Sequence, residues 1–450
     1  MNKKRLEPYL CLFHNDTLIM EKRVFVFCYK TISLISIFTI FFGFAYAIPP
    51  PIKNSLDNKS SIEIQVNNKS KEIDNEKSHI NKDMDKIKIN ALTIDENKST
   101  AVFYGANLPT EILSQYSRII VESGNVKPEE LTALQANNSR VFAYVSIGEV
   151  SPSRPWFKNI KKDWILGDNK IWDSKVMNLA STGWQDFILD SVVTPLWEAG
   201  YRGLFLDTMD SFYLFAKDPK EQEKQANALV ALLQKIQKRY PDIRFISNRG
   251  FEVLPSIGDQ LEAVVAESLF ASWDNGKKIY KETSANDQEW LLNKLKTIKN
   301  NASVDIIIID YVEIGKHDDA KKVAKKIEKE GFIPWVSIPS LDLAGVGSIE
   351  PEINTYLLLF DSKVETNTPL KLPKYQTLIN KIKSQKKVLK THDIQTGMPL
   401  GHMGGRYKSI LSALPYEKQP EFYKKWLKKQ IKEGVSINML TPKSAIPDKE

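Results

Sequence analysis

The chain has 450 residues, 42% of them hydrophobic, which is enough for one large domain with additional segments. Its two cysteines, Cys11 and Cys28, precede residue 47, so a product cleaved there has no thiol for a disulfide or a metal. The formal net charge of +8 comes from lysines and arginines spread along the chain, which favours a solvated surface and argues against nucleic acid as a partner.

An apolar stretch near the N-terminus, residues 32–44, follows basic residues and precedes Ala45-Tyr46-Ala47. About thirteen helical residues span roughly 20 Å, which is short for a bilayer core of about 30 Å. We therefore expect residues 1–47 to be a signal peptide cleaved after Ala47, and the product to be secreted or periplasmic. Contact with a membrane would come only from an uncleaved segment. In an alternative interpretation translation starts at Met20. The basic region would then have a more ordinary length, and residues 1–19 would be an over-extension of the N-terminus.

Residues 48–98 are rich in Asn, Lys, Ser, Asp and Glu and show no apolar periodicity, which predicts a disordered tether. From Ala101 onward, short runs rich in Val, Ile, Phe and Tyr alternate with longer amphipathic stretches. Such alternation is typical of a parallel sheet whose strands are joined by helices. There are eight such runs, at residues 101–106, 118–122, 140–147, 203–207, 244–248, 261–267, 304–311 and 332–338.

Eight strands alternating with helices predict a (β/α)8 TIM-type barrel, a single catalytic domain over residues 99–365. Several runs are apolar without alternation, as at residues 305–310, which fits strands buried on both faces. A doubly wound open sheet is the alternative.

Helices are expected between the strands. Thr182 suits a helix N-cap, and Gly200 and Gly331 stand where a glycine commonly ends a helix. The expected helices are residues 128–137, 182–199, 220–239, 287–299 and 318–330.

Two segments depart from the simple alternation. Residues 151–181 form a long connection with several aromatic residues, which predicts an active-site loop. After about residue 365 the chain is basic and less periodic, with one helix expected at residues 419–433. We treat residues 366–450 as a C-terminal extension of unknown role.

Active sites of such barrels lie at the C-terminal ends of the strands, and four of the predicted strand ends are acidic: Glu149, Asp207, Glu267 and Asp310. Carboxylates gathered in a cleft raise one another's pKa, so one can hold a proton while another stays ionised, as cleavage of a glycosidic bond requires. The simpler interpretation is that each carboxylate caps a loop or helix. Magnesium bound by oxygen ligands alone is a further alternative, since no histidine ends a strand.

Other chemistries have less support in the sequence. No lysine ends a strand and no glycine-rich phosphate loop follows one, so we expect neither a cofactor nor a bound metal. Aromatic side chains near the same rim have flat apolar faces that suit sugar rings, although each such residue more often packs in the core. They are Tyr104, Trp156, Tyr213, Trp273, Tyr311 and Trp335.

Three motifs, at residues 103–105, 146–149 and 203–210, give the chain a resemblance to a known family. The segments Phe-Tyr-Gly, Ser-Ile-Gly-Glu and Gly-Leu-Phe-Leu-Asp-Thr-Met-Asp resemble the endo-α-1,4-polygalactosaminidase family. That group comprises glycoside hydrolase family 114 and related hydrolase domains that act on the Pel biofilm polysaccharide. The likeness covers roughly residues 101–339, and the third motif is its most specific part.

The resemblance implies a (β/α)8 barrel that cleaves α-1,4-linked galactosamine or N-acetylgalactosamine polymers. It implies an aspartate nucleophile after the fourth strand, here Asp207, and a glutamate acid/base after the sixth, here Glu267. Glu149 and Asp310 would then hydrogen-bond sugar groups, and Asp210 would position the loop after the fourth strand. The tether and the tail have no counterpart in the family pattern.

Several alternatives stay open at this point. A retaining enzyme needs its two carboxyl groups about 5–5.5 Å apart, and an inverting one needs about 6.5–9.5 Å. Endo and exo action are both compatible with the sequence, although we expect endo action. A polysaccharide-binding barrel without activity, another amino-sugar hydrolase and a metal-assisted lyase are the rival functions. We expect a monomer whose partner is its polysaccharide.

Overall fold

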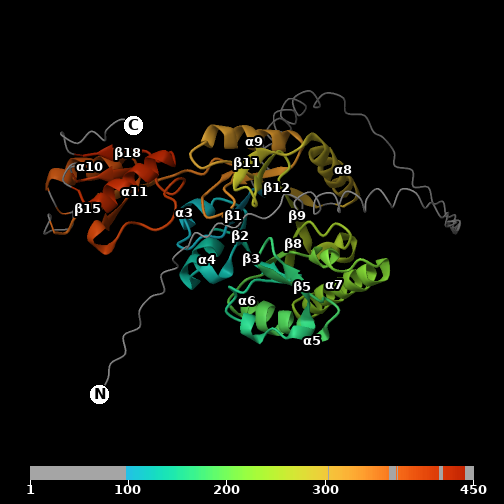
Figure 1. Ribbon diagram of the computed structural model, residues 1–450. Helices are drawn as coiled ribbons and strands as arrows, with labels where there is room; N and C mark the ends of the chain where they lie inside the picture. Colours follow the sequence, from blue (N-terminus) through green and yellow to red (C-terminus); the bar gives the residue numbers. More distant parts are fainter. Residues whose placement is uncertain (1–97, 303, 364–370, 372, 415–418, 441–450) are drawn as a thin grey trace, which may run out of the picture. The chain divides into compact units, whose positions relative to one another are not determined.

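The computed structural model describes residues 98–302, 304–363, 371, 373–414 and 419–440 (Figure 1). The expected signal peptide and all but the last residue of the expected tether lie outside the described residues. No helix in the described part of the chain is both long and apolar enough to cross a membrane.

The main sheet has eight parallel strands in the order β1-β2-β3-β7-β8-β9-β12-β13, and β14 (Val346–Gly347) pairs antiparallel with β13. All eight strands expected from the sequence are confirmed. They are β1 (Thr100–Phe103), β2 (Arg118–Val121), β3 (Arg140–Ser146), β7 (Gly203–Asp207), β8 (Arg244–Asn248), β9 (Leu261–Glu267), β12 (Asp305–Tyr311) and β13 (Ile333–Ser337).

The first and last strands approach each other, which makes the sheet a barrel and not an open doubly wound sheet. The backbone N–H of Tyr104, just after β1, donates to the carbonyl of Leu341, beyond β13, at 2.7 Å. The rings of Tyr116 and Trp335 meet edge to face at 5.5 Å, and both are almost wholly buried. Gly347 makes room for this contact, because a Cβ there would lie 2.8 Å from the Tyr116 ring.

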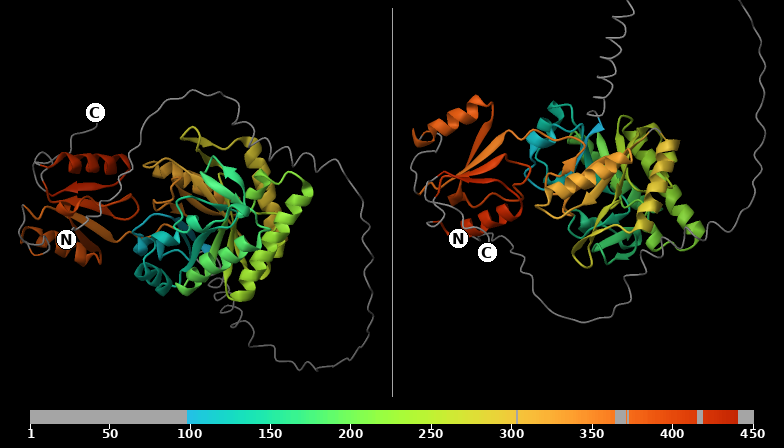
Figure 2. Two further views of the ribbon diagram at one scale, coloured as in Figure 1. Left: turned by 60° about the horizontal axis from the view of Figure 1, so that its bottom comes forward. Right: turned by 90° about the horizontal axis from the view of Figure 1, so that it is seen from above.

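Helices cover the outside of the barrel, and Figure 2 shows from two further sides how they surround its strands. Residues 306–309 of β12 are buried one after another, as expected for a strand packed on both faces. The covering helices are α4 (Pro128–Ala136), α5 (Thr182–Phe187), α6 (Thr194–Glu198), α7 (Pro219–Arg239), α8 (Ala285–Asn301) and α9 (His317–Lys329).

The helix expected at residues 182–199 is interrupted by a π-helical segment, Ile188–Val193. Pro195 has no N–H to continue the α-helical pattern, and the N–H of Thr194 bonds to the carbonyl of Leu189, five residues earlier. The N-cap also lies one residue earlier than expected, because the Ser181 hydroxyl accepts the N–H of Trp184. The glycines expected at helix ends have positive φ, +103° at Gly200 and +76° at Gly331.

The long connection after β3 forms a small antiparallel sheet in the order β4-β6-β5. Its strands are β4 (Glu149–Val150), β5 (Ile165–Asn169) and β6 (Ser174–Met177). A second hairpin, β10 (Ala271–Asp274) with β11 (Ile279–Glu282), follows β9. Both additions emerge from C-terminal strand ends, the side of the barrel where the acidic residues lie.

The C-terminal part of the chain, from residue 355 onward, contains a second parallel sheet in the order β16-β15-β17-β18. Leu358 packs with residues of α10, while Leu357 and Leu359 pack with residues of α11, so the two helices cover opposite faces. The strand β15 belongs to this sheet although it precedes residue 365, where we expected the barrel domain to end. The elements are β15 (Thr355–Phe360), α10 (Pro373–Ser384), β16 (Val388–Asp393), β17 (Ser409–Ser412), α11 (Glu421–Lys432) and β18 (Ile437–Met439).

Candidate active site

Five neighbouring strands each contribute one polar side chain at the C-terminal end of the barrel. In sheet order the strands are β3, β7, β8, β9 and β12. Four of the residues are the last of their strand, and the fifth lies two residues before the end of β3. The residues are Tyr144, Asp207, Asn248, Glu267 and Tyr311.

Hydrogen bonds join these five side chains in a continuous row. The Tyr144 hydroxyl donates to Oδ2 of Asp207 at 2.7 Å. Nδ2 of Asn248 donates to Oδ1 of Asp207 at 2.8 Å and to Oε1 of Glu267 at 2.9 Å. The Tyr311 hydroxyl donates to Oε2 of Glu267. Each of the four carboxylate oxygens therefore has at least one donor.

The shared amide nitrogen limits the distance between the two carboxyl groups. Oδ1 of Asp207 and Oε1 of Glu267 both bond to Nδ2 of Asn248, so they can lie no farther apart than 2.8 Å plus 2.9 Å, about 5.7 Å. This range includes the separation of about 5–5.5 Å found when one carboxylate acts as a nucleophile and the other as an acid/base.

The electrostatic environment makes the Asp207 carboxyl harder to ionise than an exposed aspartate. Burial of the carboxyl, together with the negative charge of Glu267, raises the pKa of Asp207 from 3.8 to about 6, and the bonds from Tyr144 and Asn248 act in the opposite direction. Burial also raises the pKa of Tyr144 and of Tyr311 far above 10, so both phenols remain hydrogen-bond donors at neutral pH.

The residue after each of three neighbouring strand ends has an unusual backbone conformation. Thr208, Arg249 and Ser268 follow Asp207, Asn248 and Glu267, and their φ angles are +60°, +53° and +64°. Such left-handed conformations are uncommon outside glycine and often lie beside functional residues. The first of these turns also requires Gly148, because a Cβ there would lie 2.0 Å from the carbonyl oxygen of Thr208.

Asp310 has contacts that differ from those expected of a sugar-binding residue. It is fully buried, and its carboxylate accepts the backbone N–H groups of Leu269, Phe270 and Ala271 at 2.6, 2.8 and 2.9 Å. Burial raises the pKa of Asp310 to about 6, although these three bonds lower it. The carboxylate therefore holds the chain that follows Glu267.

Glu149 is also turned into the protein. Its side chain is 6% exposed, and its oxygens accept the amide of Asn169 at 3.1 Å and the hydroxyl of Ser174. These partners lie on β5 and β6, so Glu149 connects that hairpin to the end of β3. Sugar binding by Glu149 and by Asp310 stays a prediction.

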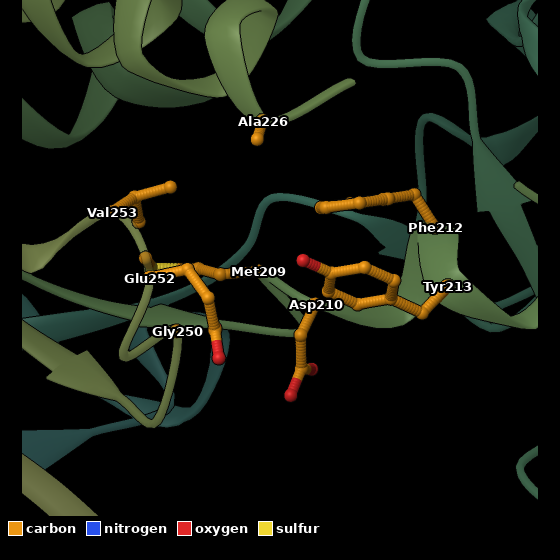
Figure 3. Close-up of a pocket in the computed structure, with 8 residues that line it drawn as sticks. All are labelled: Met209, Asp210, Phe212, Tyr213, Ala226, Gly250, Glu252 and Val253. Atoms are coloured by element: carbon orange, nitrogen blue, oxygen red, sulfur yellow. The ribbon is translucent and has the colours of Figure 1, made fainter. Parts of the chain in front are cut away.

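Asp210 and Tyr213 lie together beside a shallow recess. Figure 3 shows the carboxylate of Asp210 beside the Tyr213 ring, with the carboxylate of Glu252 pointing the same way. Met209, Phe212, Ala226, Gly250 and Val253 complete the lining of this recess. From the sequence we expected Asp210 to position the loop after the fourth strand. Nothing in the sequence indicated that Glu252 would lie near it.

The remaining aromatic residues divide into two groups. The Tyr104 ring meets the Tyr144 ring edge to face at 5.4 Å, so Tyr104 adjoins the row of five side chains. The others pack within the protein: Trp156 against Phe187 at 5.5 Å, Trp273 against Tyr280 at 4.8 Å, and Trp335 against Tyr116. Trp156 also lines a cavity between α4 and α6 that reaches Tyr144.

Two members of the row, Tyr144 and Asn248, were missed in the sequence analysis. Asn248 ends a correctly predicted strand, but only charged strand ends were considered as candidates. An inspection of every polar strand end would have found it. Tyr144 lies inside its strand, and nothing local distinguishes it. Within the described residues, no group of three or more His, Cys, Asp or Glu side chains is placed to hold a metal ion.

Comparison with known proteins identifies the barrel. The glycoside hydrolase domain of PelA from Pseudomonas aeruginosa is 34% identical, covers 56% of this chain and 99% of its own, and superposes with a TM-score of 0.52. Uncharacterized proteins of Methanocaldococcus jannaschii and Thermotoga maritima are 24% and 23% identical, over 55% and 52% of this chain and 73% and 76% of their own lengths. Residues 99–352 match the model of glycoside-hydrolase family GH114. The protein is a glycoside hydrolase and belongs to family GH114.

Proposed function

We propose that this glycoside hydrolase cleaves α-1,4-linked galactosamine or N-acetylgalactosamine polymers within the chain and with retention of anomeric configuration. The observation that carries the mechanism is the close pair Asp207 and Glu267, joined through Asn248. Family membership and the resemblance described above support the substrate class. Export is part of the proposal, and a mature protein beginning near Ile48 in the medium or periplasm would support it.

In the proposed first step, a carboxylate oxygen of Asp207 attacks the anomeric carbon while Glu267 gives its proton to the glycosidic oxygen. The bond to the leaving sugar breaks, and a glycosyl ester of Asp207 forms. In the second step Glu267 takes a proton from water, and the resulting hydroxide displaces Asp207. Oδ1 of Asp207 and Oε1 of Glu267 are at most about 5.7 Å apart, a separation that supports retention over the roughly 6.5–9.5 Å of an inverting enzyme.

The surrounding donors suit these two roles. The negative charge of Glu267 disfavours ionisation of Asp207, so a protonated Glu267 allows Asp207 to ionise more readily. The Tyr144 hydroxyl stabilises the ionised form of Asp207, the form that a nucleophile requires. The first step requires Asp207 ionised and one proton on Glu267.

The experiment measures release of reducing ends from a galactosamine-rich exopolysaccharide by the full chain and by Asp207→Asn and Glu267→Gln. We expect each change to lower kcat at least about 1,000-fold, because each removes a reacting group. The exposed positions Asp186 and Glu223 provide matched controls, Asp186→Asn and Glu223→Gln, which should retain activity.

Two outcomes would contradict the proposal. A wild-type protein that binds amino-sugar polymers and cleaves none of them would be a binding protein. An inverted anomer as the first product in an NMR time course would exclude the retaining mechanism even if Asp207 and Glu267 are both essential.

A further inference from the structure

We infer that Asn248 is a positioning residue that acts as a shared donor. Its amide holds the two carboxyl groups at their working distance and stabilises whichever of them carries the negative charge. This inference rests on the proposed function. Asn248 ends β8, the strand between the strand of Asp207 and the strand of Glu267. Its Nδ2 donates to both carboxylates, at 2.8 and 2.9 Å.

The chemistry of the primary amide suits this position. Its nitrogen carries two hydrogens, so it can donate to two carboxylates at once, whereas a hydroxyl can donate to only one. It is also neutral. A lysine or arginine would favour ionisation of both carboxyl groups and so remove the proton that the first step needs. A neutral donor with two hydrogens holds the pair together and leaves one proton on it.

The orientation of the amide follows from its neighbours. Turned the other way, Oδ1 would face two carboxylate oxygens, and both would lose a donor. In the orientation observed, Oδ1 is buried and has no hydrogen-bond partner within the described part of the chain. A buried acceptor left without a partner is unfavourable, so the contacts of Nδ2 determine how this side chain is placed.

The proposed first step moves negative charge across Asn248. Before it, Asp207 is ionised and Glu267 is protonated. After it, Asp207 is a neutral ester and Glu267 is ionised. A hydrogen bond to a charged oxygen is stronger than one to a neutral oxygen. The amide therefore stabilises Asp207 before the step and Glu267 after it, without moving.

The backbone around Asn248 resembles that around the two carboxylates. Arg249, which follows it, has a φ of +53°, close to the values for Thr208 and Ser268. Its N–H donates to the carbonyl of Val265 at 2.9 Å, and its own carbonyl accepts the Ser247 hydroxyl at 2.7 Å. Three adjacent strands thus each end in a residue that is followed by a left-handed φ. Asn248 follows the pairing of Ser247 with Leu206 on β7, and its partner on β9 is Val265, two residues before Glu267.

The test compares Asn248→Leu, which removes both hydrogens at similar size, with Ser247→Ala, which removes a hydrogen bond from the same turn and leaves the carboxylates their donors. Both variants are checked for folding by circular dichroism. We expect Asn248→Leu to lower kcat by about 10- to 100-fold with little change in KM. The acid limb of its pH profile should move up by about half a unit or more, because the bond from Asn248 lowers the pKa of Asp207. Ser247→Ala should not move that limb.

Carbon-13 NMR titration of the Asp207 carboxyl gives a second measurement that needs no substrate. The titration midpoint should be higher in Asn248→Leu than in the wild type and unchanged in Ser247→Ala. An unchanged midpoint in Asn248→Leu, or an equal shift in both variants, would overturn the shared-donor role. A shifted midpoint in a protein that cleaves no amino-sugar polymer would instead keep this role and reject the proposed function.

Discussion

At the scale of the residue, Asp207 meets two opposing requirements. A nucleophile must be ionised, yet burial and the charge of Glu267 both favour the neutral acid and raise the pKa of Asp207 to about 6. The donors Tyr144 and Asn248 act in the opposite direction. Modest changes in these hydrogen bonds therefore alter the ionised fraction of Asp207, and with it the fraction of active enzyme.

The pH dependence of activity follows from the pKa of Asp207. As the pH falls through about 6, Asp207 gains a proton and can no longer attack, so kcat/KM should fall about tenfold for each further pH unit. The measurement is kcat/KM from pH 4.5 to 8. An N-acetylated oligomer serves as the control substrate, because it has no amine that titrates. An acid limb centred near 4 would show that Asp207 behaves as an ordinary exposed aspartate.

At the scale of the element, the loops after β3 and β9 depend on buried carboxylates. Asp310 binds three consecutive backbone N–H groups after Glu267, and Glu149 binds the β5–β6 hairpin. Both were expected to hydrogen-bond sugar, because a strand-end carboxylate in a glycosidase is equally compatible with either role. Both are buried and bond to the loops that border the site, and sugar binding by either stays a prediction.

Replacing Asp310 should disturb the loop that follows Glu267. In Asp310→Asn an NH2 group faces backbone N–H donors, and at least one donor is left unpaired, which costs about 1–3 kcal/mol. We expect a lower Tm by differential scanning calorimetry together with a lower kcat. Asp242→Asn, at an exposed loop position, is the control and should leave both unchanged. An unaltered Tm in Asp310→Asn would mean that the three bonds contribute nothing to stability.

Replacing Glu149 should loosen the β5–β6 hairpin. Glu149→Ala removes the acceptor of Asn169 and Ser174, so the exposed tip with Lys170 and Trp172 should open more often. Trypsin should then cut after Lys170 about tenfold faster, as followed by mass spectrometry. Glu282→Ala, on the exposed strand β11, should be cut at the wild-type rate. Equal rates for all three proteins would show that the hairpin does not depend on Glu149.

At the scale of the whole molecule, the chain combines the barrel with a second α/β sheet that the family match does not include. The matched residues end at 352, and the next strand, β15, begins at Thr355. The sequence signal for this sheet is weak where β16 is largely exposed and where β18 has only three residues. Each of the eight barrel strands predicted from the sequence, by contrast, contains a buried apolar run.

The sequence alone determined the eight barrel strands, Asp207 and Glu267 at the ends of two of them, and most helices, since long apolar runs and strong end signals are local properties. It did not determine which polar groups meet. The row from Tyr144 through Asn248 to Tyr311 joins residues from five strands, and the burial of Glu149 and Asp310 depends on loops that fold over them. Only tertiary structure brings those residues together, because hydrogen bonds between distant residues leave no periodic pattern in the sequence.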